Sequence, residues 1–298
     1  MKYIFWGSPI FAEIVLKELI DSNFPPVAIV TNPDRPFGRK KIIKAPETKS
    51  LILNYNNNFQ NKIEIYQPEK IDKEFENELR KMDVDLFIVA AYSKIIPQSC
   101  IDIPKFGVIG VHPSLLPKYR GTSPIQSALL NGEKETGVTI YKMDKEMDHG
   151  DIIFTEKIII NEDDNYESLI KKLGKIGGQL AVKTISDLQN AINKSVVQNH
   201  NEATFTKKFK IEDGYIDPEE LYKAMNENFE VAEKILNKIK ALNPEPGTWT
   251  IAKNLSNKSF LIKDGERIKI LNAKIINQKL VLIQIQREGQ KPILFQKI

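Results

Sequence analysis

Cysteine and histidine are scarce in this sequence: 298 residues contain one cysteine and three histidines. A single thiol, Cys100, excludes an intramolecular disulfide and a thiolate metal cluster. Three histidines scattered along the chain also make a zinc site unexpected. We therefore expect no metal, and a reducing, cytoplasmic location is the default for a chain without disulfides.

Long apolar runs are missing as well. No stretch approaches the ~20 consecutive apolar residues that span a bilayer. The apolar start of the chain is short and is typical of a first strand rather than of a signal peptide. With 41% hydrophobic and 28% charged residues, the composition is that of an ordinary globular protein. We expect no membrane partner, two domains for this length, and a monomer.

A glycine-rich dinucleotide motif is absent from the first strand–helix junction. The predicted strand Tyr3–Trp6 leads into GSPIFA, which lacks the GxGxxG spacing that lets a pyrophosphate approach the backbone. This disfavours a nicotinamide-dependent dehydrogenase. Ser8 is predicted to cap the following helix, with Pro9 at its first position.

Apolar strand-like runs alternate with amphipathic helical segments through residues 1–189, which predicts an α/β fold. A Rossmann-like domain with a mostly parallel sheet is expected there, closed by a long helix at Tyr166–Leu188 in which three glycines reduce continuity. Residues 190–206 are polar and are predicted to be a linker, with His200 exposed. The predicted strands of the first domain are Tyr3–Trp6, Val27–Val30, Ile63–Tyr66, Leu86–Ala90, Val108–Val111, Thr136–Tyr141 and Ile152–Ile159.

Residues 207–298 have a different pattern. A helical segment from Tyr215 to about Leu242 precedes several short alternating runs, which predict a small OB-like β-barrel. The last fifty residues hold ten Lys or Arg and three Asp or Glu, a formal charge of +7 on a chain of +4. A basic end favours a polyanionic partner, although basic strands also protect sheet edges. The predicted strands are Trp249–Ala252, Ser259–Ile262, Ile268–Ala273, Leu280–Gln284 and Ile293–Phe295.

The segment Thr31–Glu47 is a long basic stretch that carries an aromatic residue. Its prolines and glycine are predicted to prevent any regular element. Cations around an apolar tip suit contact with nucleic acid, although a disordered charged loop remains the alternative. The candidate contact residues are Arg35, Phe37, Arg39, Lys40, Lys41 and Lys44.

His112 follows the apolar run Val108–Val111 within GVIGVHPSLLPKYRG. A titratable residue at the carboxyl end of such a strand lies where open α/β sheets bind ligands, although a lone histidine is more often structural. The acid-rich segment Lys142–Asp151, which contains His149, can fold back toward it. A carboxylate beside His112 would orient the ring and favour its charged form; the alternative is a solvated turn.

HPSLLPKYRG, followed downstream by Asp148-His149-Gly150-Asp151, resembles the folate-dependent formyltransferases. The resemblance covers nearly the whole chain, in the order and spacing of the methionyl-tRNA formyltransferase family. It implies transfer of a formyl group from 10-formyltetrahydrofolate to the amine of initiator methionyl-tRNA, for translation initiation. The matching segments are FWGSPIFA, TNPDRPFGR, QPEKI, VAAYSKIIP, PIQSALLNGEKETGVTI, MDHGDI and ALNPEPGTW.

The resemblance also implies site residues. His112 and Asp148 match the catalytic histidine and aspartate, and Gly110 stands at the position of the family's catalytic asparagine. The basic segment after the second strand and the C-terminal domain match the tRNA-binding elements. The expected folate-pocket residues are Ser114, Leu115, Leu116, Pro117, Ala90, Tyr92, Ile95 and Pro97.

Gly110 is a departure from the family pattern because it removes an expected side-chain donor to the oxyanion. Loss of one such donor typically costs on the order of 10²–10³ in rate. We expect a water to fill the space; His149, where the family usually has threonine, is a second candidate. Two other functions stay open: an amino-sugar nucleotide formyltransferase, and a catalytically impaired homologue that binds folate or tRNA.

Overall fold

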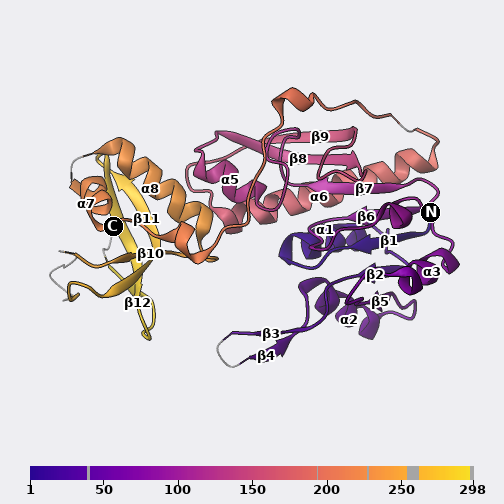
Figure 1. The fold of residues 1–298 in the computed structure, drawn as a ribbon, viewed down its shortest axis with the longest axis horizontal. Coiled ribbons are helices and arrows are strands. Elements are labelled where there is room, and N and C mark those ends of the chain that lie inside the picture. The colour runs from indigo at the N-terminus through magenta and orange to yellow at the C-terminus, as the bar shows by residue number, and fades with distance from the viewer. Residues whose placement is uncertain (39–40, 193, 227, 254–261, 296–298) are drawn as a thin grey trace. The chain divides into compact units, whose positions relative to one another are not determined.

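The computed structural model describes residues 1–38, 41–192, 194–226, 228–253 and 262–295 (Figure 1). The chain divides into two compact units. Unit 1 consists of Met1–Thr122, Glu135–Ile159 and Leu169–Thr206, and unit 2 of Ser123–Lys134, Ile160–Ser168 and Lys207–Ile298. The division into domains 1–189 and 207–298 with a linker at 190–206 stays a prediction about which segments fold independently.

Unit 1 is built on a seven-stranded sheet in the order β5-β2-β1-β6-β7-β8-β9. The pairings from β5 to β7 are parallel, and β8 and β9 are added antiparallel. Every residue of β1, β6 and β7 is buried, as expected for central strands covered on both faces. The predicted α/β, mostly parallel architecture is therefore confirmed. The strands are β1 (Tyr3–Trp6), β2 (Ala28–Val30), β5 (Glu64–Tyr66), β6 (Leu86–Val89), β7 (Val108–His112), β8 (Glu135–Lys142) and β9 (Ile152–Ile159).

The predicted cap of the first helix is wrong. Pro9 is the N-cap residue of α1 (Ile10–Asp21). The Ser8 hydroxyl instead accepts hydrogen bonds from the Asn32 amide at 2.9 Å and the Thr31 hydroxyl at 3.1 Å. The side chain therefore ties the first turn to the end of β2. The other helices outside the C-terminal region are α2 (Glu47–Asn58), α3 (Lys73–Lys81), α4 (Gln98–Ile101), α5 (Pro124–Leu130) and α6 (Tyr166–Gln189).

The basic segment after β2 contains regular structure, contrary to prediction. Strands β3 (Arg35–Phe37) and β4 (Ile42–Lys44) pair antiparallel as a hairpin that projects from the main sheet (Figure 1). Gly38 has a φ of 69° at the turn. Pro36 is accommodated because this two-stranded sheet leaves each strand an unpaired edge. The prolines and glycine of this segment therefore mark a turn within it and do not exclude regular structure.

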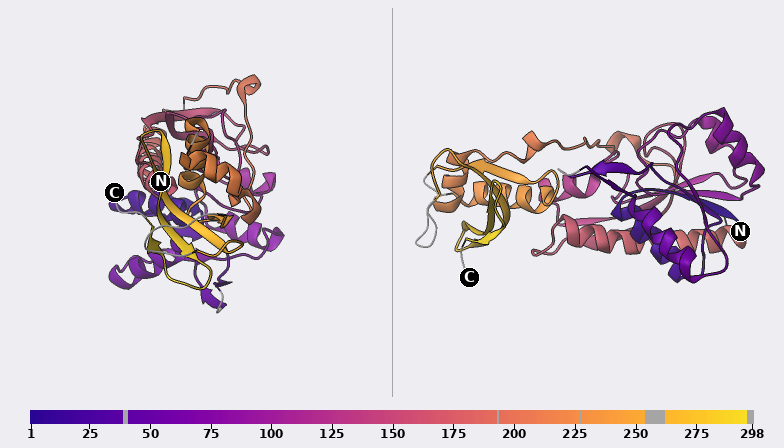
Figure 2. Two further views of the ribbon diagram at one scale, coloured as in Figure 1. Left: turned by 90° about the vertical axis from the view of Figure 1, so that its left-hand side faces the viewer. Right: turned by 90° about the horizontal axis from the view of Figure 1, so that it is seen from below.

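The glycines of α6 do not break the helix, which is continuous in all views (Figure 2). They allow close packing instead. A Cβ built on Gly177 would lie 2.7 Å from Val111 Cγ1, and one on Gly178 would lie 2.3 Å from the Glu18 Cβ. Val111 belongs to β7, so α6 packs at Gly177 against the strand that ends at His112.

Unit 2 contains a four-stranded antiparallel sheet in the order β10-β11-β12-β13. Helices α7 (Pro218–Asn226) and α8 (Phe229–Leu242) share an apolar core with it, so the predicted single helical segment is two helices. The arrangement is consistent with the predicted small barrel-like domain. Most of the predicted strand Ser259–Ile262 lies outside the described residues. The strands are β10 (Thr248–Ile251), β11 (Arg267–Ile276), β12 (Lys279–Arg287) and β13 (Ile293–Leu294).

In the part of the chain that the structure describes, the helices fall short of the length and apolar character needed to cross a bilayer.

The contact between α6 and the sheet gives a stability prediction. Gly177→Leu should lower the free energy of unfolding by about 1–3 kcal/mol, because extra methylenes in a packed interface force shifts. Lys175→Leu is the control, since Lys175 is exposed on the same helix. Urea unfolding of both variants measures the difference. Equal stability of the two variants would show that the close packing at Gly177 is unimportant.

Candidate functional site

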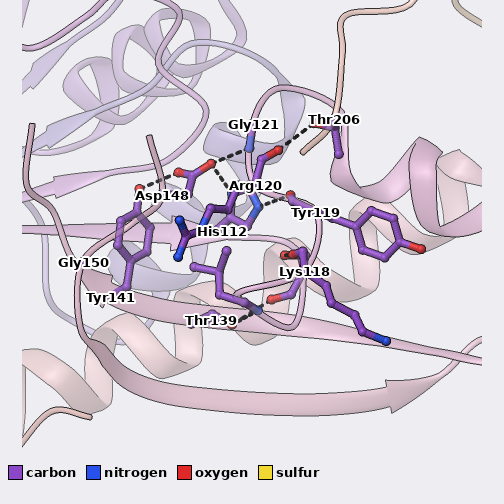
Figure 3. A network of polar contacts seen from close by, with 12 residues as sticks. His112, Lys118, Tyr119, Arg120, Gly121, Thr139, Tyr141, Asp148, Gly150 and Thr206 are labelled. Atoms are coloured by element: carbon purple, nitrogen blue, oxygen red, sulfur yellow. Dashed lines mark hydrogen bonds and ion pairs between the residues drawn. The ribbon is translucent and has the colours of Figure 1, made fainter. Parts of the chain in front are cut away.

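His112 is the last residue of β7 and its side chain is buried. The ring Nε2 lies 2.8 Å from the carbonyl oxygen of Tyr119. Because a carbonyl can only accept, Nε2 carries a proton in this arrangement. The other ring nitrogen, Nδ1, faces the Asp148 carboxylate at 3.5 Å (Figure 3). The imidazole is therefore fixed through Nε2, and Nδ1 is the nitrogen directed at the carboxylate.

Asp148 comes from the loop between β8 and β9. That loop does bring a carboxylate to His112, as the sequence predicted. Oδ2 accepts a hydrogen bond from the Gly121 amide, and Oδ1 accepts one from the Tyr141 hydroxyl, both at 2.6 Å. Asp148 also has a φ of 50°, a left-handed conformation that non-glycine residues seldom adopt and that is often found at functional sites.

The turn after β7 is held by internal hydrogen bonds. The Ser114 hydroxyl donates to the Lys118 carbonyl at 2.6 Å, and the Thr139 hydroxyl donates to the Ser114 carbonyl at 2.7 Å. Ser114 and Leu116 are buried, whereas Leu115 and Pro117 are half-buried. Among the predicted folate-pocket residues of this turn, Ser114 and Leu116 therefore shape the loop, and Leu115 and Pro117 offer accessible surface.

The second predicted part of the folate pocket follows β6. Ala90 is buried, Pro97 is half-buried, and Ile95 is 91% exposed. Burial raises the pKa of Tyr92 to about 12, so its hydroxyl stays protonated. That hydroxyl oxygen is buried without a hydrogen-bond partner among the described residues. The loop thus offers an apolar tip at Ile95, whereas the Tyr92 hydroxyl is enclosed by the protein.

The predicted open space beside Gly110 is wrong. A Cβ built on Gly110 would lie 2.2 to 2.7 Å from three atoms of the Tyr141 ring and hydroxyl. Tyr141 is paired directly with Gly110 across the β7–β8 ladder. The tyrosine side chain therefore occupies the volume that we expected a water to fill.

His149 contacts a different set of groups from Asp148. Its Nδ1 lies 2.7 Å from Asp144 Oδ2. Its ring stacks on the His200 ring with centroids 4.1 Å apart. His200 is exposed, as predicted, but its Nδ1 also accepts from the Arg120 guanidinium at 2.8 Å. These contacts favour a structural role for His149 in the loop over the predicted compensation for Gly110.

Segment 190–206 is attached to the site, which the sequence did not indicate. Gln198 donates to the carbonyl oxygens of Asp148 at 2.9 Å and Gly150 at 2.7 Å. Its own amide oxygen accepts from the Arg120 guanidinium at 2.7 Å. Arg120 lies in the KYRG part of the motif that carries the resemblance but was not predicted as a site residue, and nothing in the sequence distinguished Gln198 from its polar neighbours.

Four of the six predicted tRNA-contacting residues lie in the described part of the β3–β4 hairpin: Arg35, Phe37, Lys41 and Lys44. Arg35 pairs with Glu69 at 2.6 Å, and Lys44 pairs with Glu47 at 2.7 Å. Lys41 is exposed, and Phe37 is part of β3, whereas Arg39 and Lys40 lie outside the described residues. Two further residues of the hairpin were not predicted: Ile42 and Ile43, which are 66% and 62% exposed.

Clusters of three or more His, Cys, Asp or Glu side chains suited to a metal ion are not found within the described ranges.

Comparison with known proteins agrees with this architecture. Residues 1–185 match the family model described as formyl transferase. The match spans every strand of the seven-stranded sheet and both members of the His112–Asp148 pair. The N-terminal part is therefore a formyltransferase domain.

Curated relatives extend the similarity beyond that domain. A methionyl-tRNA formyltransferase of Sulfurihydrogenibium sp. (strain YO3AOP1) is 36% identical over 94% of this chain and 82% of the relative. One from Kosmotoga olearia is 38% identical over 87% of this chain and 79% of the relative. The chain belongs to the methionyl-tRNA formyltransferase family.

Solved structures of other formyltransferases share the fold. A 4-N formyltransferase from Francisella tularensis superposes with a TM-score of 0.63 at 21% identity, covering 90% of this chain and 96% of that one. The N-formyltransferase from Helicobacter canadensis, in complex with folinic acid and dTDP-3-aminofucose, gives 0.61 at 23% identity, covering 93% and 88%. At this identity the likeness establishes the fold.

The contacts of Gln198 give a second stability prediction. Gln198→Ala should lower the free energy of unfolding by about 1–3 kcal/mol, because it leaves two carbonyls and one buried guanidinium short of partners. Asn199→Ala is the control: Asn199 is the exposed neighbour and bonds only locally to Glu202. Thermal and urea unfolding measure both variants. If Gln198→Ala is no less stable than Asn199→Ala, segment 190–206 does not hold the Asp148 loop.

Proposed function

We propose that this protein transfers the formyl group of 10-formyltetrahydrofolate to the amino group of initiator methionyl-tRNA in the cytoplasm, acting as a monomer. The observation that carries the proposal is the extent of the similarity to methionyl-tRNA formyltransferases. It covers 94% of the chain at 36% identity, including the basic C-terminal region, whereas the N-formyltransferase in complex with dTDP-3-aminofucose, which superposes over 93% of the chain, is 23% identical.

The His112–Asp148 pair supplies the acid–base chemistry of this reaction. An amine that attacks the formyl carbon must lose a proton, and the carbonyl oxygen gains negative charge as the new C–N bond forms. The bond between the formyl carbon and N10 of the folate then breaks, and N10 takes up a proton. Nδ1 of His112 faces Asp148, and the carboxylate stabilises the ring when it gains a proton. The Nε2 bond to the Tyr119 carbonyl keeps the ring from turning during this exchange. We propose His112 as the proton acceptor and Asp148 as its orienting partner.

Folate binding is proposed at the loops that follow β6 and β7. Leu115, Pro117 and Ile95 offer apolar surface. An apolar lining with few polar groups suits a planar heterocycle. When bound there, 10-formyltetrahydrofolate supplies the formyl group, and the chain's own residues bind and orient it.

The β3–β4 hairpin is the proposed contact to the tRNA backbone. It presents cationic side chains together with two exposed isoleucines, Ile42 and Ile43. Cations supply affinity for phosphates, and contiguous exposed apolar side chains are typical of interaction sites. A sugar nucleotide is too small to require such an extended surface, which favours tRNA over the amino-sugar alternative.

A formylation assay tests the proposed function. The purified chain is incubated with 10-formyltetrahydrofolate and, in parallel, with charged initiator tRNA or an amino-sugar nucleotide. We expect formyl-methionyl-tRNA and no formylated sugar. Formylation of the sugar alone would establish the alternative enzyme. Binding of folate or tRNA without turnover would identify an impaired homologue.

The catalytic pair gives a kinetic prediction. Asp148→Asn should lower turnover by on the order of 10²–10⁴, the usual contribution of general acid–base groups, with folate affinity unchanged. Asp144→Asn is the matched control, because this acid of the same loop bonds His149 rather than His112. Single-turnover formylation measures both. An Asp148→Asn enzyme as fast as Asp144→Asn would exclude the carboxylate from the chemistry.

The hairpin gives a binding prediction. Replacing Arg39, Lys40 and Lys41 by alanine should weaken tRNA binding and make it less sensitive to salt. The slope of log K against log salt is negative, and each lost phosphate contact makes it less steep by about 0.7–0.9.

The control for this variant removes the same charge from three exposed lysines elsewhere: Lys73, Lys81 and Lys105. Filter binding across a salt series compares the two triple variants. Equal slopes for both would mean that the hairpin does not contact the tRNA backbone.

A further inference from the structure

Tyr141 is a buried tyrosine of β8 whose hydroxyl reaches the catalytic carboxylate. Its side chain is 4% exposed. The antiparallel register of β7 and β8 pairs it with Gly110, two residues before His112. Directly paired residues in neighbouring strands have adjacent side chains. Because Gly110 has no side chain, the phenol lies over its backbone.

The phenol stands where a side chain of residue 110 would begin. The hydroxyl oxygen is 2.7 Å from the position of a Cβ on Gly110, and the nearest ring carbon is 2.2 Å from it. Gly110 and Tyr141 therefore form a matched pair: a side chain at 110 and the tyrosine cannot both occupy this volume. The asparagine expected from the family resemblance is absent, and a different polar group fills its place.

The Tyr141 hydroxyl donates to Asp148 Oδ1 at 2.6 Å, whereas Gly121 and His112 approach Oδ2. Burial, and then the charge of Asp148, raises the pKa of Tyr141 well above its ordinary value. The hydroxyl thus keeps its proton and remains a donor. With one oxygen bonded by Tyr141, the carboxylate cannot rotate away from the imidazole without breaking a charge-assisted hydrogen bond.

We propose that Tyr141 is a positioning residue of this enzyme, which holds the Asp148 carboxylate against His112 from the volume that an asparagine side chain at residue 110 would need. The inference rests on the proposed function for its kinetic consequence, but not for its geometry. It assigns the positioning of the carboxylate to a side chain on the neighbouring strand. It also explains why glycine is required at position 110.

Tyr141→Phe tests the hydroxyl while keeping the ring. We expect kcat to fall by about 10- to 150-fold, the range for a lost hydrogen bond to a charged group, while the KM for each substrate stays unchanged. Tyr3→Phe is the control, since Tyr3 is also buried in the sheet, with its hydroxyl bonded to the Phe24 carbonyl. A Tyr141→Phe enzyme with unchanged kcat would overturn the proposal.

A double substitution at Gly110 and Tyr141 tests whether the loss of kcat caused by a side chain at residue 110 can be rescued. Gly110→Asn alone should lower kcat, because its side chain meets the tyrosine ring. Gly110→Asn combined with Tyr141→Leu clears the ring and should exceed both single variants in kcat. A double variant no faster than the slower single one would contradict the matched pair. Melting temperatures of all variants separate loss of folding from loss of positioning.

A readout independent of turnover keeps the proposal testable if formylation of methionyl-tRNA is not observed. Only three histidines give ring signals, so the ¹⁵N shifts of His112 can be followed by NMR. Tyr141→Phe should change the His112 ring shifts and leave those of His200 unaltered. Unchanged His112 shifts would overturn the positioning role, whatever reaction the enzyme catalyses.

Discussion

The site depends on keeping one carboxylate, that of Asp148, facing one imidazole in an interior that excludes most water. An ionised carboxylate loses much of its solvation there and must be bonded on both oxygens. Tyr141 and Gly121 supply those bonds, and the left-handed backbone of Asp148 directs its side chain at them. The geometry of His112 follows from this arrangement and from the Tyr119 carbonyl.

Distant parts of unit 1 contribute to the same constraint. Gln198, from the segment after α6, bonds the backbone of the Asp148 loop and is itself bonded by Arg120. The backbone of the Asp148 loop is thus fixed by hydrogen bonds from a segment that contains little regular structure. Close packing of α6 on β7, through Gly177 and Val111, supports the strand that carries His112. Precise positioning by groups that do not react is what preorganised catalysis requires.

The sequence was sufficient where local pattern determines structure. The apolar runs and the turn-forming residues around them predicted the exact bounds of β1 and β9. The resemblance identified the His112–Asp148 pair. It was insufficient where the outcome depends on neighbours in space. The role of Tyr141 depends on the β7–β8 register, because only pairing with Gly110 brings its hydroxyl to Asp148.

Gln198 is a second such residue, because its function is defined by two carbonyls about fifty residues away in the chain. The hairpin β3–β4 was missed for another reason. Proline and glycine mark a break in regular structure, but the pattern of short, exposed strands on either side carries no hydrophobic periodicity. The sequence alone therefore does not specify the register of β7 and β8, the long-range contacts of Gln198 or the pairing of short exposed strands.

The central claim is that the His112–Asp148 pair is the place of formyl transfer. A crystal structure of the chain with a stable formylated folate tests it most directly. We expect the formyl carbon to lie beside His112, with room for an amine nitrogen at about 3–3.5 Å from it. The Asp148 carboxylate should still be bonded to Tyr141. A folate whose formyl group lies away from His112, with the pair unoccupied, would contradict the account.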